Sequence, residues 1–84
     1  MQTLELVIGG NEGLHARPAA ELVRIASAPE TTVKVGRAGQ PAVAAGSILA
    51  LLSLGLRSGE RVVFTIAGPD EDSVAQQINE LLGK

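Results

Sequence analysis

The segment Glu60–Ala67 shows the clearest periodicity in the chain, because apolar and other residues alternate along it. Val62, Phe64 and Ile66 fall on one side, so a strand with a two-residue side-chain period would bury that side and leave the other open. A sheet with one apolar face needs a covering layer. The rest of the chain must therefore supply helices whose apolar stripes pack against it.

Three further segments have the alternating or β-branched residues that are typical of strands: Gln2–Ile8, Thr31–Val35 and Gln40–Val43. Pro41 has no N–H to donate to a neighbouring strand, which places Gln40–Val43 at an edge of the sheet or in an irregular strand. The glycine-containing segment Arg37–Gln40 is expected to form a turn between the last two.

Two segments have the three-and-four spacing of an amphipathic helix. The first is Ala16–Ser27, which Pro29 should end, because the residue before a proline disfavours helical geometry. The second follows Asp70, the expected N-cap, and ends at Gly83. The expected buried stripes are Ala19, Leu22, Val23 and Ala26 in the first helix and Val74, Ile78, Leu81 and Leu82 in the second.

The segment Ser47–Leu54 is ambiguous, because six of its eight residues are apolar and composition alone would also allow a buried strand. Ser47 as an N-cap and Gly55 as a stop favour a short helix, and Leu and Ala form helices better than strands. A two-layer fold can bury only one face of such a helix. Some of its apolar side chains should therefore be exposed, and an exposed apolar patch is typical of a contact site.

The order of these elements is β-α-β-β-α-β-α. Four strands and three helices predict an α/β fold of the α+β type, a two-layer sandwich in which an antiparallel sheet carries its helices on one face. At 84 residues the chain is expected to form a single domain, residues 1–84, that buries roughly 60–65% of its unfolded surface. Its core must be aliphatic, because Phe64 is the only aromatic residue.

The composition excludes several classes of protein. A net charge of −2 argues against nucleic-acid binding, which requires a basic excess, and the single aromatic residue argues against base stacking. The chain has no Cys and therefore no disulfide or thiolate metal site. Met1–Glu5 lacks the features of a signal peptide, and no run approaches the ~18 apolar residues of a membrane span. A soluble, cytoplasmic protein is expected.

The strongest functional signal is the segment Gly13–Ala20, which contains the only histidine, His15. A loop with three glycines in six positions, Ile8–Gly13, precedes it, and Pro18 suits a first helical turn because its missing N–H would have no partner there. His15 and Arg17 are thus placed at a helix N-terminus, whose free N–H groups and partial positive charge attract anions. An imidazole and a guanidinium at such an end are suited to hold a phosphoryl group.

Less specific roles remain open for these residues. His15 could cap the helix without any chemistry, and Arg17 could be a solvated surface residue. A metal site is disfavoured because the chain offers one imidazole and no thiol, and a hydrolytic triad is equally poor around a single histidine. Within Ser47–Leu54, the side chains of Ile48, Leu49 and Leu52 could belong to the core.

The segment Gly13–Ala20 (Gly-Leu-His-Ala-Arg-Pro-Ala-Ala) resembles the active-site signature of HPr, the histidine-containing phosphocarrier family of the bacterial sugar phosphotransferase system. A second segment, Gly46–Gly55, resembles the regulatory-serine segment of that family, and the likeness covers essentially the whole chain. The resemblance implies an open-faced sandwich and a stoichiometric phosphoryl relay rather than an enzyme with a substrate pocket of its own.

The resemblance also implies how the site works. His15 would carry the phosphoryl group on Nδ1, Arg17 would stabilise that group, and Ala16 and Pro18 would support the site from the helix start. Enzyme I, charged by phosphoenolpyruvate, would donate the group, and Enzyme IIA domains would accept it. No metal or cofactor is implied, and a monomer is expected.

Ser47 matches a serine that a dedicated ATP-dependent HPr kinase/phosphorylase modifies in many bacteria, although Gly46 stands where the family often has Lys or another polar residue. The alternative is an ordinary N-cap. The resemblance further implies partner docking through Ala20, Arg24, Ile48, Leu49 and Leu52. Two rival hypotheses remain: a specialised, for instance nitrogen-related, HPr paralogue, and a non-catalytic α/β interaction module.

Overall fold

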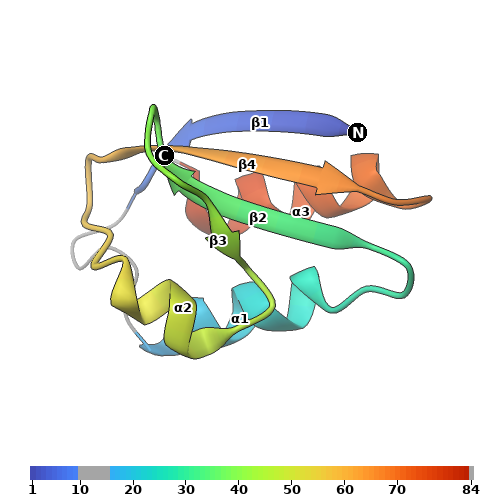
Figure 1. Ribbon diagram of the computed structural model, residues 1–84, viewed down its shortest axis with the longest axis horizontal. Coiled ribbons are helices and arrows are strands. Elements are labelled where there is room, and N and C mark those ends of the chain that lie inside the picture. Colours follow the sequence, from blue (N-terminus) through green and yellow to red (C-terminus); the bar gives the residue numbers. More distant parts are fainter. Residues whose placement is uncertain (10–15, 84) are drawn as a thin grey trace.

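The fold is a sheet covered by helices on one face, as the computed structural model shows for residues 1–9 and 16–83, the part of the chain that it describes (Figure 1). For Ala16 and Arg17 it describes the backbone alone. Within this part the predicted order β-α-β-β-α-β-α is confirmed, and none of its helices is long and apolar enough to cross a membrane. The elements are β1 (Gln2–Val7), α1 (Ala16–Ala26), β2 (Thr32–Arg37), β3 (Val43–Ala44), α2 (Ile48–Ser53), β4 (Arg61–Ala67) and α3 (Glu71–Leu82).

The sheet has the strand order β1-β4-β2-β3, and all neighbouring strands are antiparallel. β4 lies between β1 and β2, so Phe64 stands opposite Leu4 on one side and Val35 on the other. Val62, Phe64 and Ile66 are fully buried. The alternation seen in the sequence therefore marks β4, one of the two inner strands of the sheet, with its apolar side in the core.

The third strand differs from its prediction. β3 is an edge strand as expected, but it begins at Val43 rather than Gln40 and is two residues long. The residues before it lie against the end of β2 instead, where a Cβ added to Gly36 would come within 2.8 Å of the Pro41 carbonyl oxygen. This close approach of two backbones requires glycine. Arg37, which was expected in the turn, is the last residue of β2.

The first two helices begin and end close to the predicted residues. α1 begins at Ala16 and ends just before Ser27, which was predicted as its last residue. The predicted cap of α2 is confirmed, because the Ser47 Oγ accepts a hydrogen bond from the Ala50 N–H at 3.3 Å. Gly55 follows α2 with a left-handed backbone (φ 59°), the conformation that commonly ends a helix.

The expected chemistry at the start of α3 is wrong in one respect. Asp70 stands at the N-cap position, but its side chain makes no capping hydrogen bond. The acidic residues Glu71 and Asp72 occupy the first turn, as predicted, where they suit the positive end of the helix. Glu71 also pairs with the N-terminal amine of Met1 at 3.1 Å, which ties the start of β1 to α3.

The core is aliphatic around Phe64, and no polar or charged residue is buried within the described part of the chain. The predicted stripes of α1 and α3 lie in this core or against it, together with Ile25 and Ala75, which the prediction omitted. α2 contributes Leu51, which is fully buried, whereas Leu49 on the same helix is 76% exposed. One side of α2 therefore packs in the core and another faces solvent, as the two-layer argument predicted.

Leu51→Ala should lower the free energy of unfolding by about 2–5 kcal/mol, because it removes buried side-chain atoms and leaves a cavity. Leu49→Ala, a matched control on the same helix, should change it by less than about 0.5 kcal/mol, since that side chain faces solvent. Urea unfolding measures both variants, provided that the denaturant slope is unchanged. Equal losses in the two variants would contradict the assigned faces of α2.

Candidate functional site

The histidine motif lies across a boundary of the described residues. His15 is outside them, and only the backbone of Arg17 is described. The structure places Ala16 at the first position of α1 and Pro18 in its first turn. The predicted helix start directly after His15 is therefore confirmed, while the roles of His15, Ala16, Arg17 and Pro18 in the site stay predictions.

Backbone hydrogen bonds hold the residues that lead into the motif from two directions. The Ile8 N–H donates to the Glu60 carbonyl at 2.9 Å, and the Ile8 carbonyl accepts from the Gly59 N–H at 2.8 Å. The Gly9 N–H donates to the Leu82 carbonyl, also at 2.8 Å. Because the Ile8 side chain is buried as well, the last described residues before the motif are fixed to both the α2–β4 loop and the end of α3.

The helix after the motif is anchored by packing. Leu22 is fully buried, and Pro18 is half-buried in the first turn. Ala20 and Arg24, which were predicted to contact partners, are both exposed. The Arg24 guanidinium donates to the Glu21 Oε2 from Nη2 at 2.7 Å and from Nε at 3.2 Å, so its charge is balanced within α1.

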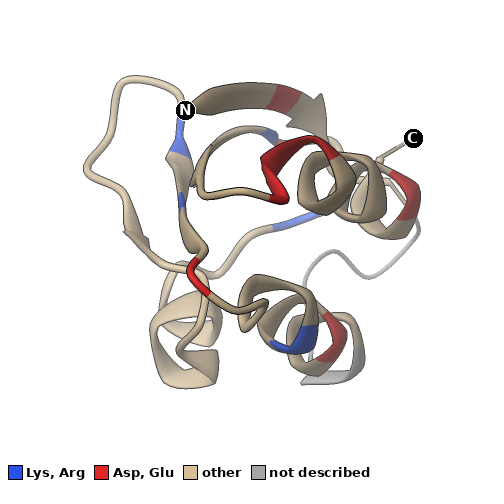
Figure 2. Cartoon of the chain, turned by 90° about the vertical axis from the view of Figure 1, so that its right-hand side faces the viewer, with Lys and Arg blue, Asp and Glu red and all other residues tan. Residues whose placement is uncertain are grey.

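An exposed apolar patch, consisting of Ile48, Leu49 and Leu52, lies on α2. The exposed fractions of these residues are 38%, 76% and 40%. α1 contacts α2 and runs beside it (Figure 1), and Figure 2 shows α2 without a charged residue while α1 carries charges of both signs. The predicted exposure of this patch is confirmed, and its use in docking stays a prediction.

Ser47 is exposed at the N-terminal end of the same helix, next to Ile48 in the patch. Its hydroxyl oxygen caps the helix, and its N–H donates to the Ala44 carbonyl at 3.3 Å. The structural half of the prediction, a serine N-cap, is confirmed. The regulatory half stays a prediction that the surface position of the hydroxyl allows.

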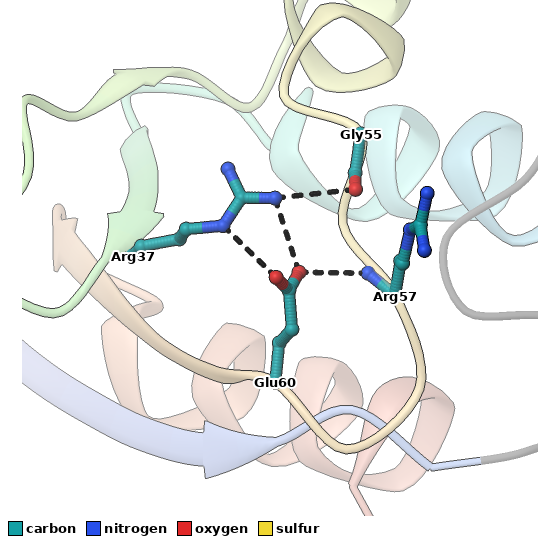
Figure 3. Close-up of polar contacts among 4 residues, drawn as sticks. All are labelled: Arg37, Gly55, Arg57 and Glu60. Carbon is teal, nitrogen blue, oxygen red and sulfur yellow. Dashed lines mark hydrogen bonds and ion pairs between the residues drawn. The ribbon is translucent and has the colours of Figure 1, made fainter.

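One polar cluster was missed by the sequence reasoning, and Figure 3 shows it. In this cluster, called the clasp below, Arg37 at the end of β2 pairs with Glu60 just before β4: Nε and Nη2 each donate to a different carboxylate oxygen at 3.1 Å. The same Nη2 donates to the Gly55 carbonyl at 3.2 Å, and the Arg57 N–H donates to the Glu60 Oε2 at 2.8 Å. Nothing in the sequence singles out two opposite charges 23 positions apart.

These hydrogen bonds, first that from Arg37 and then that from the Arg57 backbone, hold the pKa of Glu60 below its usual value. A lowered pKa in the folded state means that the carboxylate stabilises the fold above the pKa of an unfolded Glu. That contribution is lost only as the pH falls through the lowered value. The Glu60 carboxylate is therefore ionised and paired with Arg37 at pH values around neutral.

Comparisons with known proteins show which chains this one resembles in sequence and in fold. Residues 2–84 match a family model described as the PTS HPr component phosphorylation site. The chain is 35% identical over 77 residues to phosphocarrier protein HPr of Streptomyces coelicolor, covering 92% of this chain and 83% of that protein. It is 34% identical over 82 residues to phosphocarrier protein HPr of Pseudomonas aeruginosa, covering 98% and 91%. The crystal structure of HPr from Thermoanaerobacter tengcongensis superposes with a TM-score of 0.88 at 33% identity, covering 98% of this chain and 91% of that one.

Proposed function

Because the chain belongs to the HPr family of the phosphotransferase system, we propose that His15 is the residue on which this phosphocarrier holds its phosphoryl group. The observation that supports His15 is its place in the chain. It is the only histidine, and it directly precedes Ala16, the first residue of α1. A non-catalytic interaction module would have no need of a histidine and an arginine at this junction.

The proposed reaction needs a neutral imidazole and positive charge around the phosphoryl oxygens. The N-terminus of α1 supplies both conditions, because its free N–H groups attract anions and its partial positive charge disfavours the imidazolium form. Nδ1 of His15 attacks the phosphorus, and the N–P bond forms as the bond from phosphorus to the donor breaks. The Arg17 guanidinium pairs with the phosphoryl oxygens during transfer.

The proposed donor is Enzyme I, and the proposed acceptors are Enzyme IIA domains. The acceptor takes the group by the reverse step, in which the N–P bond to His15 breaks, so the protein is a stoichiometric carrier rather than an enzyme. This chemistry needs no metal or cofactor. Both partners would dock on the patch of α2 and on the exposed side of α1 around Ala20 and Arg24, where apolar burial contributes about 25 cal/mol per Å².

We place this carrier in the cytoplasm, as a monomer with one domain over residues 1–84. The single-domain proposal is supported by the core, in which residues from all three described helices and from β1, β2 and β4 form one cluster. The lack of Cys fits a reducing compartment. A monomer suits a carrier that must present the same face to donor and acceptor in turn.

Ser47 is proposed as a second, regulatory phosphorylation site for an HPr kinase/phosphorylase. Its hydroxyl is exposed at a helix N-terminus, where a phosphate is compatible with the fold because its charge complements the helix dipole. The same phosphate would place a charge of roughly −2 beside Ile48 in the patch, which opposes docking through apolar contact. Modification of Ser47 would thereby lower phosphoryl transfer at His15 without touching it.

Incubation with Enzyme I and labelled phosphoenolpyruvate should place one acid-labile, base-stable phosphoryl group on the protein. His15→Ala should remove all of the label, since the chain has no other histidine. Ser47→Ala should keep the label, because serine does not carry it in this reaction. Acid treatment of the labelled proteins followed by counting measures the outcome, and label that persists in His15→Ala would refute the assignment.

Incubation of the His15→Ala protein with ATP and an HPr kinase should place an acid-stable phosphate on Ser47. A second change, Ser47→Ala, should abolish it. Ser53→Ala is the matched control, because Ser53 is also exposed on α2 but its hydroxyl donates to the Leu49 carbonyl at 2.7 Å. Mass spectrometry of the intact proteins decides, and a Ser47→Ala protein that still gains phosphate shows that Ser47 is only a cap.

The affinity for Enzyme I should change little across ~0.05–0.5 M salt, a range over which exposed charges become strongly screened. The reason is that α2 carries no charge and Arg24 is already paired with Glu21. Leu49→Lys should weaken binding by roughly tenfold or more while the melting temperature stays nearly constant, since Leu49 is exposed.

The matched control is Gln76→Lys, which adds the same charge to the exposed side of α3, a helix that lies apart from α2 (Figures 1 and 2). It should leave the affinity unchanged, and titration calorimetry compares the three proteins at each salt concentration. A steep loss of affinity with salt in the wild-type protein would show that charges rather than the patch hold the complex.

A further inference from the structure

We propose that Arg37 and Glu60 are positioning residues for phosphoryl transfer. They fix the position of the residues that precede the histidine motif, Ile8 and Gly9, relative to the end of α2. This inference rests on the proposed function of His15. It assigns the clasp a role in the rate of transfer, beyond its contribution to the stability of the fold.

The first step runs from the Glu60 side chain to the motif. The carboxylate accepts from the Arg57 N–H, and the Glu60 N–H donates back to the Arg57 carbonyl at 3.2 Å, so side chain and backbone together close the turn at residues 57–60. Gly59 and Glu60 in this turn make the two backbone hydrogen bonds to Ile8. The position of the carboxylate is thus transmitted through one turn to Ile8, the neighbour of Gly9, which is the last residue described before the motif.

The second step runs from Arg37 to α2, the helix that carries the patch. Its Nη2 donates to the carbonyl of Gly55, which directly follows Leu54, the C-cap of α2. Arg37 itself is fixed in β2, opposite Val62 of β4. One guanidinium therefore ties the end of α2, the end of β2 and the turn before β4 to one another (Figure 3).

Together these contacts hold both the end of α2, the helix that carries the patch, and Ile8, which precedes the motif, to the turn at residues 57–60. A partner bound to the patch on α2 must meet His15 with the reacting atoms in line, and a misplacement of about 1 Å can cost ~100-fold in rate. Apolar packing alone is non-directional. A bidentate Arg–carboxylate pair with two backbone partners supplies direction as well as attraction.

A second ion pair on the same sheet provides the comparison. Arg61 Nη1 and Glu5 Oε1 lie 3.0 Å apart, but this pair is exposed and joins two strands that are already hydrogen-bonded to each other. The Arg37–Glu60 pair is half-buried and also lies beside a strand ladder, which reaches Arg37 and Val62. Unlike the first pair, it also holds the Gly55 carbonyl and the Arg57 N–H, which lie in the loop outside that ladder. Glu5→Gln thus removes one carboxylate charge and its pairing with an arginine, as Glu60→Gln does, but leaves the contacts to Gly55 and Arg57 intact.

The test is single-turnover transfer from phosphorylated Enzyme I to the wild-type protein, Glu60→Gln and Glu5→Gln, followed by rapid quench. Glu60→Gln should lower the maximal rate by roughly tenfold or more, while the concentration for half-maximal rate stays within about twofold, because the patch itself is intact. Glu5→Gln should match the wild type in both quantities. Arg37→Lys keeps the positive charge but loses the guanidinium that donates from two nitrogens, so it should also lower the maximal rate.

A second readout separates positioning from stability. His15 is the only histidine, so its imidazole signals in an NMR titration are unambiguous. The imidazole pKa and chemical shifts should change in Glu60→Gln and stay at wild-type values in Glu5→Gln. A merely structural clasp would lower the free energy of unfolding and leave both the transfer rate and the imidazole titration of the folded protein unchanged.

The outcomes are distinguishable from a failure of the proposed function. If the wild-type protein takes no phosphoryl group on His15, the proposed function itself is wrong. If the wild type is phosphorylated and Glu60→Gln and Arg37→Lys equal Glu5→Gln in maximal rate and titration, the clasp does not position the motif. A rise in the half-saturating concentration at an unchanged maximal rate also overturns the proposal, because it would make the clasp part of the docking surface.

Discussion

Burial of the apolar side of β4 is the interaction on which the rest of the structure depends. Val62, Phe64 and Ile66 are fully buried in this inner strand, and Phe64 is the largest of the fully buried side chains. With one aromatic residue in the chain, no other side chain could fill the same space. Since a domain of this size has a small margin of stability, each helix must contribute apolar side chains to this face.

This one-sided burial also explains the character of α2. The helix is apolar on nearly all sides, yet only Leu51 among its residues is buried. The sheet has one covered face, so the remaining apolar residues of α2 are left in solvent as the patch of Ile48, Leu49 and Leu52. An apolar surface of this kind is typical of a contact site, which is consistent with the proposed docking of a donor and an acceptor in turn.

The local patterns allowed most of the fold to be predicted from the sequence, and contacts between distant segments account for the rest. Side-chain period and the Ser47 cap identified β4 and α2. The two-layer argument predicted that some apolar side chains of α2 are exposed, and the resemblance to HPr indicated which ones. The start of β3 was wrong, because the approach of Pro41 to Gly36 is a contact between backbones. For the site, residue types singled out the motif around His15, and the resemblance to HPr supplied the roles of its residues, which stay predictions. The clasp was not, because charge pairs give no periodic signal.

Apolar packing and directional hydrogen bonds make different contributions near the residues that precede the motif. Ile8 and Leu56 are buried, so packing holds the residues before the motif and those after α2 against the core. Such packing keeps the two side chains buried but allows their segments to rotate and slide, because the hydrophobic effect has no preferred direction. The hydrogen bonds of Arg37 and Glu60 have preferred angles as well as lengths. They connect the loop around Leu56 to the turn that bonds Ile8, so they supply the direction that packing lacks.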